Sequence, residues 1–208
     1  MGACYSSASN TASPTPPGSP SMAVVFQICA TARLVIALGD LTKFGGDAIV
    51  NAANKRMLGG GGVDGAIHRA AGPDLYDECH TVPEVSNGVR CPTGEARITK
   101  GYNLPAKHVI HTVGPIYEDD DESEPLLAAA YTSSMRLANE AGLKFVAFPA
   151  ISCGVYGYPK NKAAVVSLRS VAASIGDVSE VHFILFGQDV FDQYFDAAKA
   201  QFGKHVEL

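Results

Sequence analysis

The chain has 208 residues, a length typical of one domain, and its 47% hydrophobic and 18% charged residues are usual for a soluble α/β protein. The formal net charge is −5 at pH 7, and no run of Lys and Arg is longer than the pair Lys55-Arg56, which argues against nucleic-acid binding as the main function. Tryptophan is absent, which excludes a tryptophan platform for ligands. An anionic small ligand remains possible, because backbone N–H groups bind phosphate without basic side chains.

The cysteines indicate an intracellular protein of the cytoplasm or nucleus. The five are Cys4, Cys29, Cys79, Cys91 and Cys153. They are scattered and odd in number, which is typical of reduced thiols, and the chain has no N-x-S/T sequon. No Cys or His group has zinc-site spacing, so we predict no metal site and no cofactor.

Residues 1–21 are rich in Ser, Thr, Pro and Ala and bury too little apolar surface to offset the entropy of ordering. We therefore predict a flexible tail over residues 1–21 and one domain over residues 22–208. The chain opens with Met1-Gly2-Ala3-Cys4-Tyr5-Ser6, which fits the pattern for N-myristoylation at Gly2, with Cys4 as a candidate second anchor. The pattern is short, and we favour a chance match.

The apolar stretch at residues 22–38 has two other interpretations. It resembles the hydrophobic region of a signal peptide, with Ala30-Thr31-Ala32 as a cleavage site, but the first basic residue of the chain is Arg33, and a signal peptide needs positive charge earlier. As a membrane span it is short, and Arg33 interrupts it. We predict strands here and no transmembrane segment.

Short apolar runs then alternate with helical patterns. The predicted strands are residues 34–38, 48–50, 96–99, 109–111, 145–148 and 181–186. The predicted helices are residues 63–79, 125–141, 159–175 and 189–202, with Pro125 and Pro159 as first residues and Gly142 and Gly176 as stop signals. Several strands are almost entirely apolar, as expected for strands covered on both faces. This alternation predicts a three-layer α/β/α domain.

Three segments at strand ends carry candidate site residues. The first is Gly39-Asp40-Leu41-Thr42. The Asp40 carboxylate either caps the next turn or accepts hydrogen bonds from an exocyclic amine of a ligand. The spacing alone favours the capping role.

The second segment runs from Asn51 through Asn54 and four consecutive glycines, Gly59 to Gly62, into a predicted helix. Glycines let the backbone approach a ligand closely, and a helix N-terminus offers free N–H groups and a partial positive charge. Together they predict a phosphate cradle. The lysine of a P-loop is absent, which excludes a kinase or NTPase loop.

Asp64 begins the helix after the glycines. It is either a helix cap or a general base that holds a catalytic water beside the phosphates, and spacing does not separate the two. His68, four residues later, lies on the same helix face and is interpreted as a core residue.

The third segment is residues 149–159, where a strand leads into a loop with Gly154 and Gly157 and then a helix. It is a second candidate anion nest. Cys153 has no nearby histidine in sequence to act as its base, which argues against a cysteine nucleophile. Tyr156 is more plausible as a packing surface for a sugar or base.

These segments together resemble the macrodomain family, in its MacroD-type ADP-ribosyl hydrolase branch. The resemblance covers residues from about 34 to 202 and excludes the tail. It implies a three-layer α/β/α fold with a mixed, mostly parallel six-stranded sheet. The motifs that carry it are residues 39–42, 47–54, 58–68, 91–96, 104–106, 109–115 and 147–159.

The resemblance also implies a role for each site residue. Asp40 binds the adenine amino group, and Phe186, expected at the end of the last strand, packs near the adenine. Asn54 binds the distal ribose, and Asp64 serves the catalytic water, so Asn54 and Asp64 are the implied catalytic residues. Leu41 and Cys153 depart from residues frequent in the family, which puts a role for the Cys153 side chain in doubt. The implied diphosphate-binding residues are Gly61, Gly62, Val63, Ser152, Cys153, Gly154, Val155 and Tyr156, and Leu41 completes the implied ligand-binding set.

The resemblance implies a metal-free hydrolase that removes mono-ADP-ribose from acidic side chains of proteins and deacetylates O-acetyl-ADP-ribose. Its partners are then ADP-ribose, its esters and mono-ADP-ribosylated proteins, and we expect a monomer. Two alternatives stay open: a reader module that binds ADP-ribosylated partners without cleaving them, and a phosphatase acting on ADP-ribose 1″-phosphate.

Overall fold

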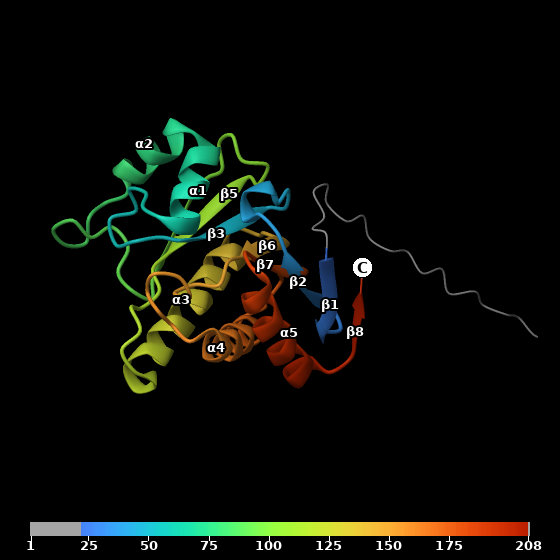
Figure 1. Cartoon of the computed structure of the whole chain (residues 1–208). Coiled ribbons are helices and arrows are strands. Elements are labelled where there is room, and N and C mark those ends of the chain that lie inside the picture. The colour runs from blue at the N-terminus through green and yellow to red at the C-terminus, as the bar shows by residue number, and fades with distance from the viewer. Residues whose placement is uncertain (1–21, 208) are drawn as a thin grey trace, which may run out of the picture.

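The computed structural model describes residues 22–207, and the predictions for residues 1–21 lie outside this range. An eight-stranded sheet lies between two groups of helices (Figure 1). Its order is β4-β5-β3-β6-β7-β2-β1-β8. The strands are β1 (Met22–Cys29), β2 (Ala32–Leu38), β3 (Ala48–Ala52), β4 (Ala96–Lys100), β5 (His108–Thr112), β6 (Phe145–Phe148), β7 (Glu180–Leu185) and β8 (His205–Glu207).

The predicted mixed, mostly parallel sheet is confirmed. The neighbouring strands β5, β3, β6, β7 and β2 run parallel, and β4, β1 and β8 pair antiparallel at the two sides. The predicted number of six strands is wrong. The stretch at residues 22–38 supplies two strands, β1 and β2, and three residues near the C-terminus add β8 to the edge of β1. A three-residue strand is too short to show a pattern in the sequence.

Within residues 22–207, five α-helices complete the three layers. The helices α1 (Gly62–Ala71) and α2 (Pro73–Thr81) cover one face of the sheet, and α3 (Asp120–Glu140), α4 (Lys160–Ala173) and α5 (Gln188–Phe202) cover the other (Figure 1). Each face has its own apolar core. The core under α3, α4 and α5 contains the rings of Tyr131, Phe148, Phe183 and Tyr194. The predicted α/β/α architecture is therefore confirmed.

Two helix boundaries differ from the prediction. The helix expected over residues 63–79 is two helices, because Gly72 adopts φ +84°, a left-handed conformation that ends α1, and Pro73 starts α2. The helix expected to begin at Pro125 begins at Asp120, and Pro125 lies inside it. Asp119 caps this earlier start by accepting a hydrogen bond from the backbone N of Glu122 at 2.9 Å.

The parallel strands place the candidate loops at one edge of the sheet. Loops that follow β2, β3, β6 and β7 leave from the carboxyl ends of neighbouring parallel strands, where ligands of open α/β sheets bind. The loop after β6 is anchored to the core, since the backbone N of Ile151 donates to the buried Tyr131 hydroxyl at 3.1 Å. Among residues 22–207, no helix is long and apolar enough to cross a membrane.

Candidate functional site

Asp40 and Phe186 lie at adjacent strand ends. Asp40 follows β2, Phe186 follows β7, and the backbone N of Gly39 donates to the Leu185 carbonyl at 3.0 Å. Phe186 lies one residue beyond its strand rather than inside it, and its side chain is 92% exposed. A solvent-exposed ring of this kind offers a flat apolar surface to a ligand.

The capping role of Asp40 is present in the structure. Asp40 precedes a short 3-10 helix (Leu41–Lys43), and its Oδ1 accepts from the backbone N and the hydroxyl of Thr42 at 2.9 and 2.8 Å. The Asp40 side chain is exposed, whereas Leu41 is buried in the core under α1 and α2. The second carboxylate oxygen of Asp40 has no partner among residues 22–207 and is free to accept from a ligand.

The glycine loop ends at the N-terminus of α1, as predicted. Gly61 is the N-cap, Gly62 adopts φ +59°, and a Cβ atom on either residue would meet nothing within 4 Å. These glycines therefore border open space rather than packed side chains. The first N–H groups of α1, including that of Val63, have no partner within the helix and are directed toward its N-terminal end. This geometry suits an anion.

Gly60 has a different reason to be glycine. A Cβ atom there would lie 3.0 Å from Oδ2 of Asp64 and 3.2 Å from Nδ2 of Asn54. The structure thus brings Asn54 and Asp64 to the same point of the glycine loop. Asn54 also shapes this loop: its Nδ2 donates to the Gly59 carbonyl at 2.9 Å, and its Oδ1 accepts from the backbone N of Arg56 at 3.0 Å.

Asp64 is not the helix cap. The cap position belongs to Gly61, and the Asp64 side chain is directed into the protein, where the residue is only 3% exposed. Its Oδ1 accepts from Nδ2 of Asn51 at 2.7 Å and lies 3.4 Å from Nε2 of His68. Its Oδ2 is buried and has no hydrogen-bond partner among residues 22–207. Burial raises the pKa of Asp64, and the Asn51 hydrogen bond and the nearby His68 ring oppose this effect. A carboxyl with a raised pKa and a free buried oxygen is suited to accept a proton.

Two residues beside Asp64 have roles that the sequence interpretation missed. His68 was interpreted as a core residue, but its largely buried ring faces the Asp64 carboxylate. Asn51 was given no role, although it is fully buried on β3 and holds Asp64. An asparagine within an almost entirely apolar strand was the available signal, because a buried amide needs hydrogen-bond partners.

The loop after β6 approaches the loop after β5 closely. Ser152 adopts φ +65°, and its carbonyl accepts from the backbone N of Tyr158 at 3.0 Å. A Cβ atom on Gly114 would lie 2.2 Å from the Ser152 hydroxyl oxygen, so only glycine fits there. The Ser152 hydroxyl is buried without a partner among the described residues. A non-glycine residue with positive φ is strained, and such strain is frequent at ligand sites.

The remaining residues of this loop line its outer side. Gly154 is exposed, and a Cβ atom there would meet nothing within 4 Å. Val155 is 100% exposed. Tyr156 is half-buried, and its carbonyl accepts from the backbone N of Tyr117 at 2.8 Å. Burial raises the pKa of the Cys153 thiol to about 12, which makes it a poor nucleophile near neutral pH.

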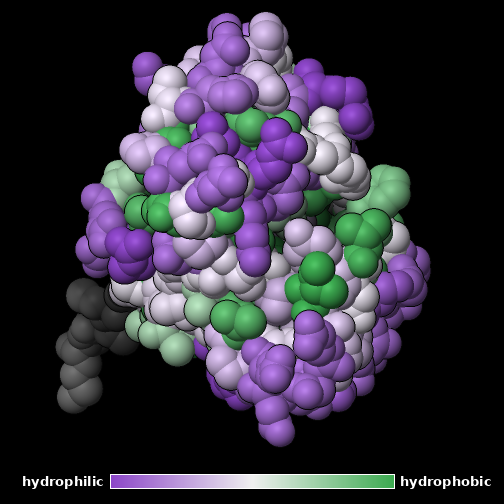
Figure 2. Space-filling model, turned by 90° about the vertical axis from the view of Figure 1, so that its left-hand side faces the viewer, coloured by the Kyte–Doolittle hydropathy of each residue, from purple (hydrophilic) through white to green (hydrophobic). Residues whose placement is uncertain are grey.

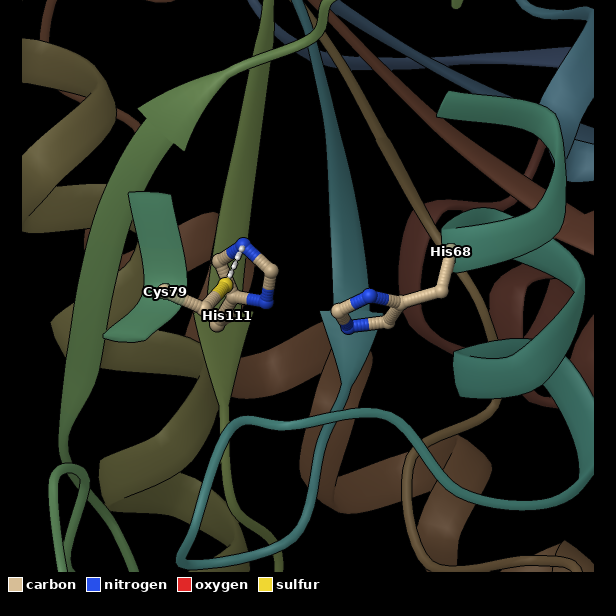
Figure 3. A group of neighbouring side chains, drawn as sticks. All are labelled: His68, Cys79 and His111. Atoms are coloured by element: carbon tan, nitrogen blue, oxygen red, sulfur yellow. Dashed lines mark hydrogen bonds between the residues drawn. The ribbon is translucent and has the colours of Figure 1, made fainter. Parts of the chain in front are cut away.

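One side-chain cluster has the composition of a metal site. Ligand atoms of His68, Cys79 and His111 lie within 4.8 Å of one another (Figure 3). Both nitrogens of His111 already have partners, since Nδ1 lies 3.1 Å from Nδ2 of Asn51 and Nε2 lies 2.9 Å from the hydroxyl of Thr99. Burial also raises the pKa of Cys79 to about 12, which opposes the thiolate that a metal requires. The contacts of His111 and the protonated thiol of Cys79 therefore oppose metal binding, and the absence of a metal stays a prediction.

A pocket of about 130 Å³ adjoins the Asn54 side of the site. Its lining residues are Asn54, Arg56, Leu58, Gly59 and Tyr76. Figure 2 shows the side of the molecule where α2 and the start of α3 lie, and hydrophobic side chains are scattered there among hydrophilic ones rather than gathered in one patch.

The chain is similar to known macro domains. The family model described as "Macro domain" matches residues 50–167. A macro domain-containing protein of Xanthomonas campestris is 56% identical over 137 residues, which are 65% of this chain and 76% of that protein. The O-acetyl-ADP-ribose deacetylase of Escherichia fergusonii is 46% identical over 161 residues, which are 76% of this chain and 90% of that protein.

Solved structures give the same result. The Oceanobacillus iheyensis macrodomain with ADP superposes on this chain with a TM-score of 0.81 at 42% identity. The superposition covers 86% of this chain and 97% of the Oceanobacillus chain. The Trypanosoma brucei macrodomain in complex with ADP-ribose superposes with a TM-score of 0.70 at 44% identity. This superposition covers 78% of this chain and 68% of the Trypanosoma chain. Family model, relatives and structures agree with the fold described above. The chain belongs to the macro domain family.

Proposed function

We propose that the chain binds ADP-ribose along the edge formed by the loops after β2, β3, β6 and β7. Asp40 accepts from the adenine amino group with its free oxygen, and the exposed Phe186 ring packs beside the base. This assignment is supported by their adjacent positions at the ends of β2 and β7. The choice of ADP-ribose as ligand is supported by the similarity to the Trypanosoma brucei macrodomain in complex with ADP-ribose.

In this proposal the diphosphate lies between two loops. The N-terminus of α1 contributes the backbone N–H groups of Gly61, Gly62 and Val63, and the second loop contributes residues 152–156. The open space above Gly61 and Gly62 and the positive end of the α1 dipole support this assignment. Asn54, which meets Asp64 at Gly60, then faces the distal ribose.

We further propose that the protein hydrolyses esters of the distal ribose without a metal. The single observation that carries this step is the buried Oδ2 of Asp64, which has no partner in the described part of the chain and adjoins Asn54. Asp64 holds a water there and accepts one of its protons while the water oxygen bonds to a carbon of the ester C–O bond that breaks. The ester C–O bond breaks, and the leaving group departs with a proton supplied by solvent. Positioning and electrostatics account for most of the rate.

The proposed substrates share this ester linkage. They are O-acetyl-ADP-ribose and proteins that carry mono-ADP-ribose on an acidic side chain. The first is supported by the similarity to the O-acetyl-ADP-ribose deacetylase of Escherichia fergusonii. The second follows from the same chemistry, since an aspartyl or glutamyl ester presents the same ester linkage of the distal ribose to the same water.

One experiment tests the proposed function and separates it from its alternatives. The protein is incubated in parallel with a Glu-linked ADP-ribosyl peptide, a Ser-linked ADP-ribosyl peptide, O-acetyl-ADP-ribose and ADP-ribose 1″-phosphate. We expect turnover of the two ester substrates and retention of the Ser linkage. Tight binding of ADP-ribose without any turnover would identify a reader, and phosphate release alone would identify a phosphatase.

A further inference from the structure

His111 lies beneath the proposed reaction site and connects it to the sheet. The residue is fully buried on β5, and the parallel register of β3 and β5 pairs it with Asn51. Its Nδ1 lies 3.1 Å from Nδ2 of Asn51, and its Nε2 lies 2.9 Å from the Thr99 hydroxyl and 3.7 Å from Sγ of Cys79. Figure 3 shows the Cys79 sulfur beside this ring. Both ring nitrogens therefore have polar partners.

The partners define the tautomer of His111. Burial lowers its pKa to about 3, so the ring is neutral at physiological pH. The Asn51 Nδ2 group can only donate, so Nδ1 of His111 is the acceptor and Nε2 carries the proton. That proton is donated to the Thr99 hydroxyl, whose own proton is directed to the carbonyl of Lys100 at 3.2 Å.

The same contacts define the orientation of the Asn51 amide. One N–H of Nδ2 is directed to Oδ1 of Asp64 and the other to Nδ1 of His111. The Asp64 contact decides this orientation, because a flipped amide would place its oxygen 2.7 Å from a carboxylate oxygen that can only accept. In the orientation observed, the Asn51 oxygen is buried without a partner, which is costly. The Asn51 side chain thus makes both hydrogen bonds of its Nδ2 group and leaves its carbonyl oxygen without one.

We propose that His111 is a positioning residue for the reaction, because its neutral Nδ1 locks the Asn51 amide with an N–H directed at Asp64. The locked donor stabilises the ionised Asp64 and fixes the direction of its free oxygen. The inference rests on the proposed function for the role of Asp64, but the lock itself is a property of the free protein. Its effect on Asp64 is measured without any substrate.

Few other ionisable groups face Asp64. His68 comes from its own helix, Cys79 from α2 and His111 from β5. With pKa values of about 12 and about 3, Cys79 and His111 keep their charge state between about pH 4 and pH 9. His68 is common to the wild type and every variant. A difference in the titration of Asp64 between the variants therefore reports on the Asn51 donor.

The experiment uses the full chain and compares His111→Asn with His111→Gln. The Asn amide reaches the position of Nδ1 and can accept from Asn51, whereas the Gln amide reaches the position of Nε2. His111→Leu removes both contacts. The Asp64 pKa is read from carboxyl ¹³C shifts in NMR titrations. We expect it to rise by about one unit in the Leu and Gln variants, the scale of one hydrogen bond to a charged group, and to stay near the wild-type value in the Asn variant.

Kinetics provide the second readout. We expect kcat for an ester substrate to fall about tenfold in the Leu and Gln variants at pH values below the folded pKa of Asp64, because a rise of one pKa unit leaves a tenth of the ionised form there. The affinity for ADP-ribose should stay within about twofold. The acid limb of the pH profile moves to higher pH, because Asp64 must be ionised to accept a proton. A purely structural role predicts the opposite order, since Gln fills the His cavity better than Asn does.

The outcomes separate the inference from the proposed function. An unchanged Asp64 pKa in folded His111→Leu and His111→Gln overturns the inference, whatever the activity. If the wild type cleaves no ester but the Asp64 pKa shifts as expected in the His111 variants, the proposed function is wrong and the positioning of Asn51 by His111 is confirmed. If the Leu and Gln variants do not fold, Thr99→Val decides: loss of the Nε2 acceptor loosens the ring and must raise the Asp64 pKa in the same direction.

Discussion

Asn51 donates a hydrogen bond of 2.7 Å to Asp64, and this contact joins the central strand β3 to the first turn of α1. Both residues are buried, so the carboxylate is held by an amide rather than by solvent. One oxygen is bound and the other is free.

Asp64→Asn should lower turnover of an ester-linked ADP-ribosyl substrate by about 10²–10⁴-fold, the usual contribution of a general base. The affinity for ADP-ribose should change much less, because the backbone groups of the loops and Asp40 remain. Single-turnover kinetics and calorimetry on the same preparation check both values. Affinity and turnover falling together, with loss of a cooperative thermal transition, would show that Asp64 only supports the fold.

The same variant has a predicted effect on stability that depends on pH. Because the pKa of Asp64 is raised in the folded state, ionising this buried group costs folding free energy once the pH exceeds its unfolded value of about 4. Asp64→Asn removes that cost. The free energy of unfolding of the variant relative to wild type should therefore grow as pH rises through the folded pKa of Asp64 and then level off. Urea unfolding at a series of pH values measures it, and a difference that shrinks with rising pH would contradict the sign.

Asp40→Ala should weaken ADP-ribose binding by about 1.5–3 kcal/mol, the scale of a hydrogen bond to a charged group. It should also reduce the preference for adenine over guanine and uracil analogues. Since Asp40 caps the turn at Thr42, Asp40→Ser is the matched control that can keep a cap but has no carboxylate. Calorimetry in which both variants bind like wild type would remove Asp40 from the site.

Gly154→Glu should block ligand binding and leave the fold intact. A Cβ atom on Gly154 meets nothing within 4 Å, so the side chain enters open space where the diphosphate is proposed to lie. Gly154→Gln separates bulk from charge, and the Glu variant should bind more weakly because like charges repel. Wild-type affinity in both variants would show that the diphosphate lies elsewhere.

Gly114→Ala should destabilise the protein by about 1–3 kcal/mol, as overpacking does. Its Cβ would lie 2.2 Å from the Ser152 hydroxyl and 2.5 Å from a methyl group of Ile151, so the loop after β6 must move. Gly154→Ala, in the same loop but with free space around it, is the control for stability. Equal unfolding midpoints in urea for the two variants would rule out the close contact.

Chelators should not reduce turnover. Both nitrogens of His111 already have hydrogen-bond partners, and the thiol of Cys79 is protonated and therefore a poor metal ligand. The assay compares the rate before and after incubation with a chelator and dialysis. Complete loss of activity that a single divalent ion restores would refute the proposed metal-free mechanism.

The sequence determined by itself whatever depends on neighbours along the chain. The glycines, the helix that follows them and the strands at residues 145–148 and 48–50 are local features, because periodicity and turn chemistry need only a few adjacent residues. Residues 39–42, 51–68 and 149–159 were recognised in the same way. The predicted start of α3 at Pro125 was wrong, although proline is frequent at helix starts. The helix begins at Asp120 instead, because Asp119 caps it there and acidic residues fill its first turn.

The tertiary structure alone decided which side chains meet. Asn51, Asp64 and His111 are brought together by the parallel register of β3 and β5 and by the packing of α1, and no spacing in the sequence encodes these contacts. Whether Asp64 caps a helix or faces a buried amide depends on the direction of its side chain, which only the packed α1 defines. Contacts between distant segments depend on how the layers pack, and for that reason the direction of a catalytic carboxylate becomes visible only in the fold.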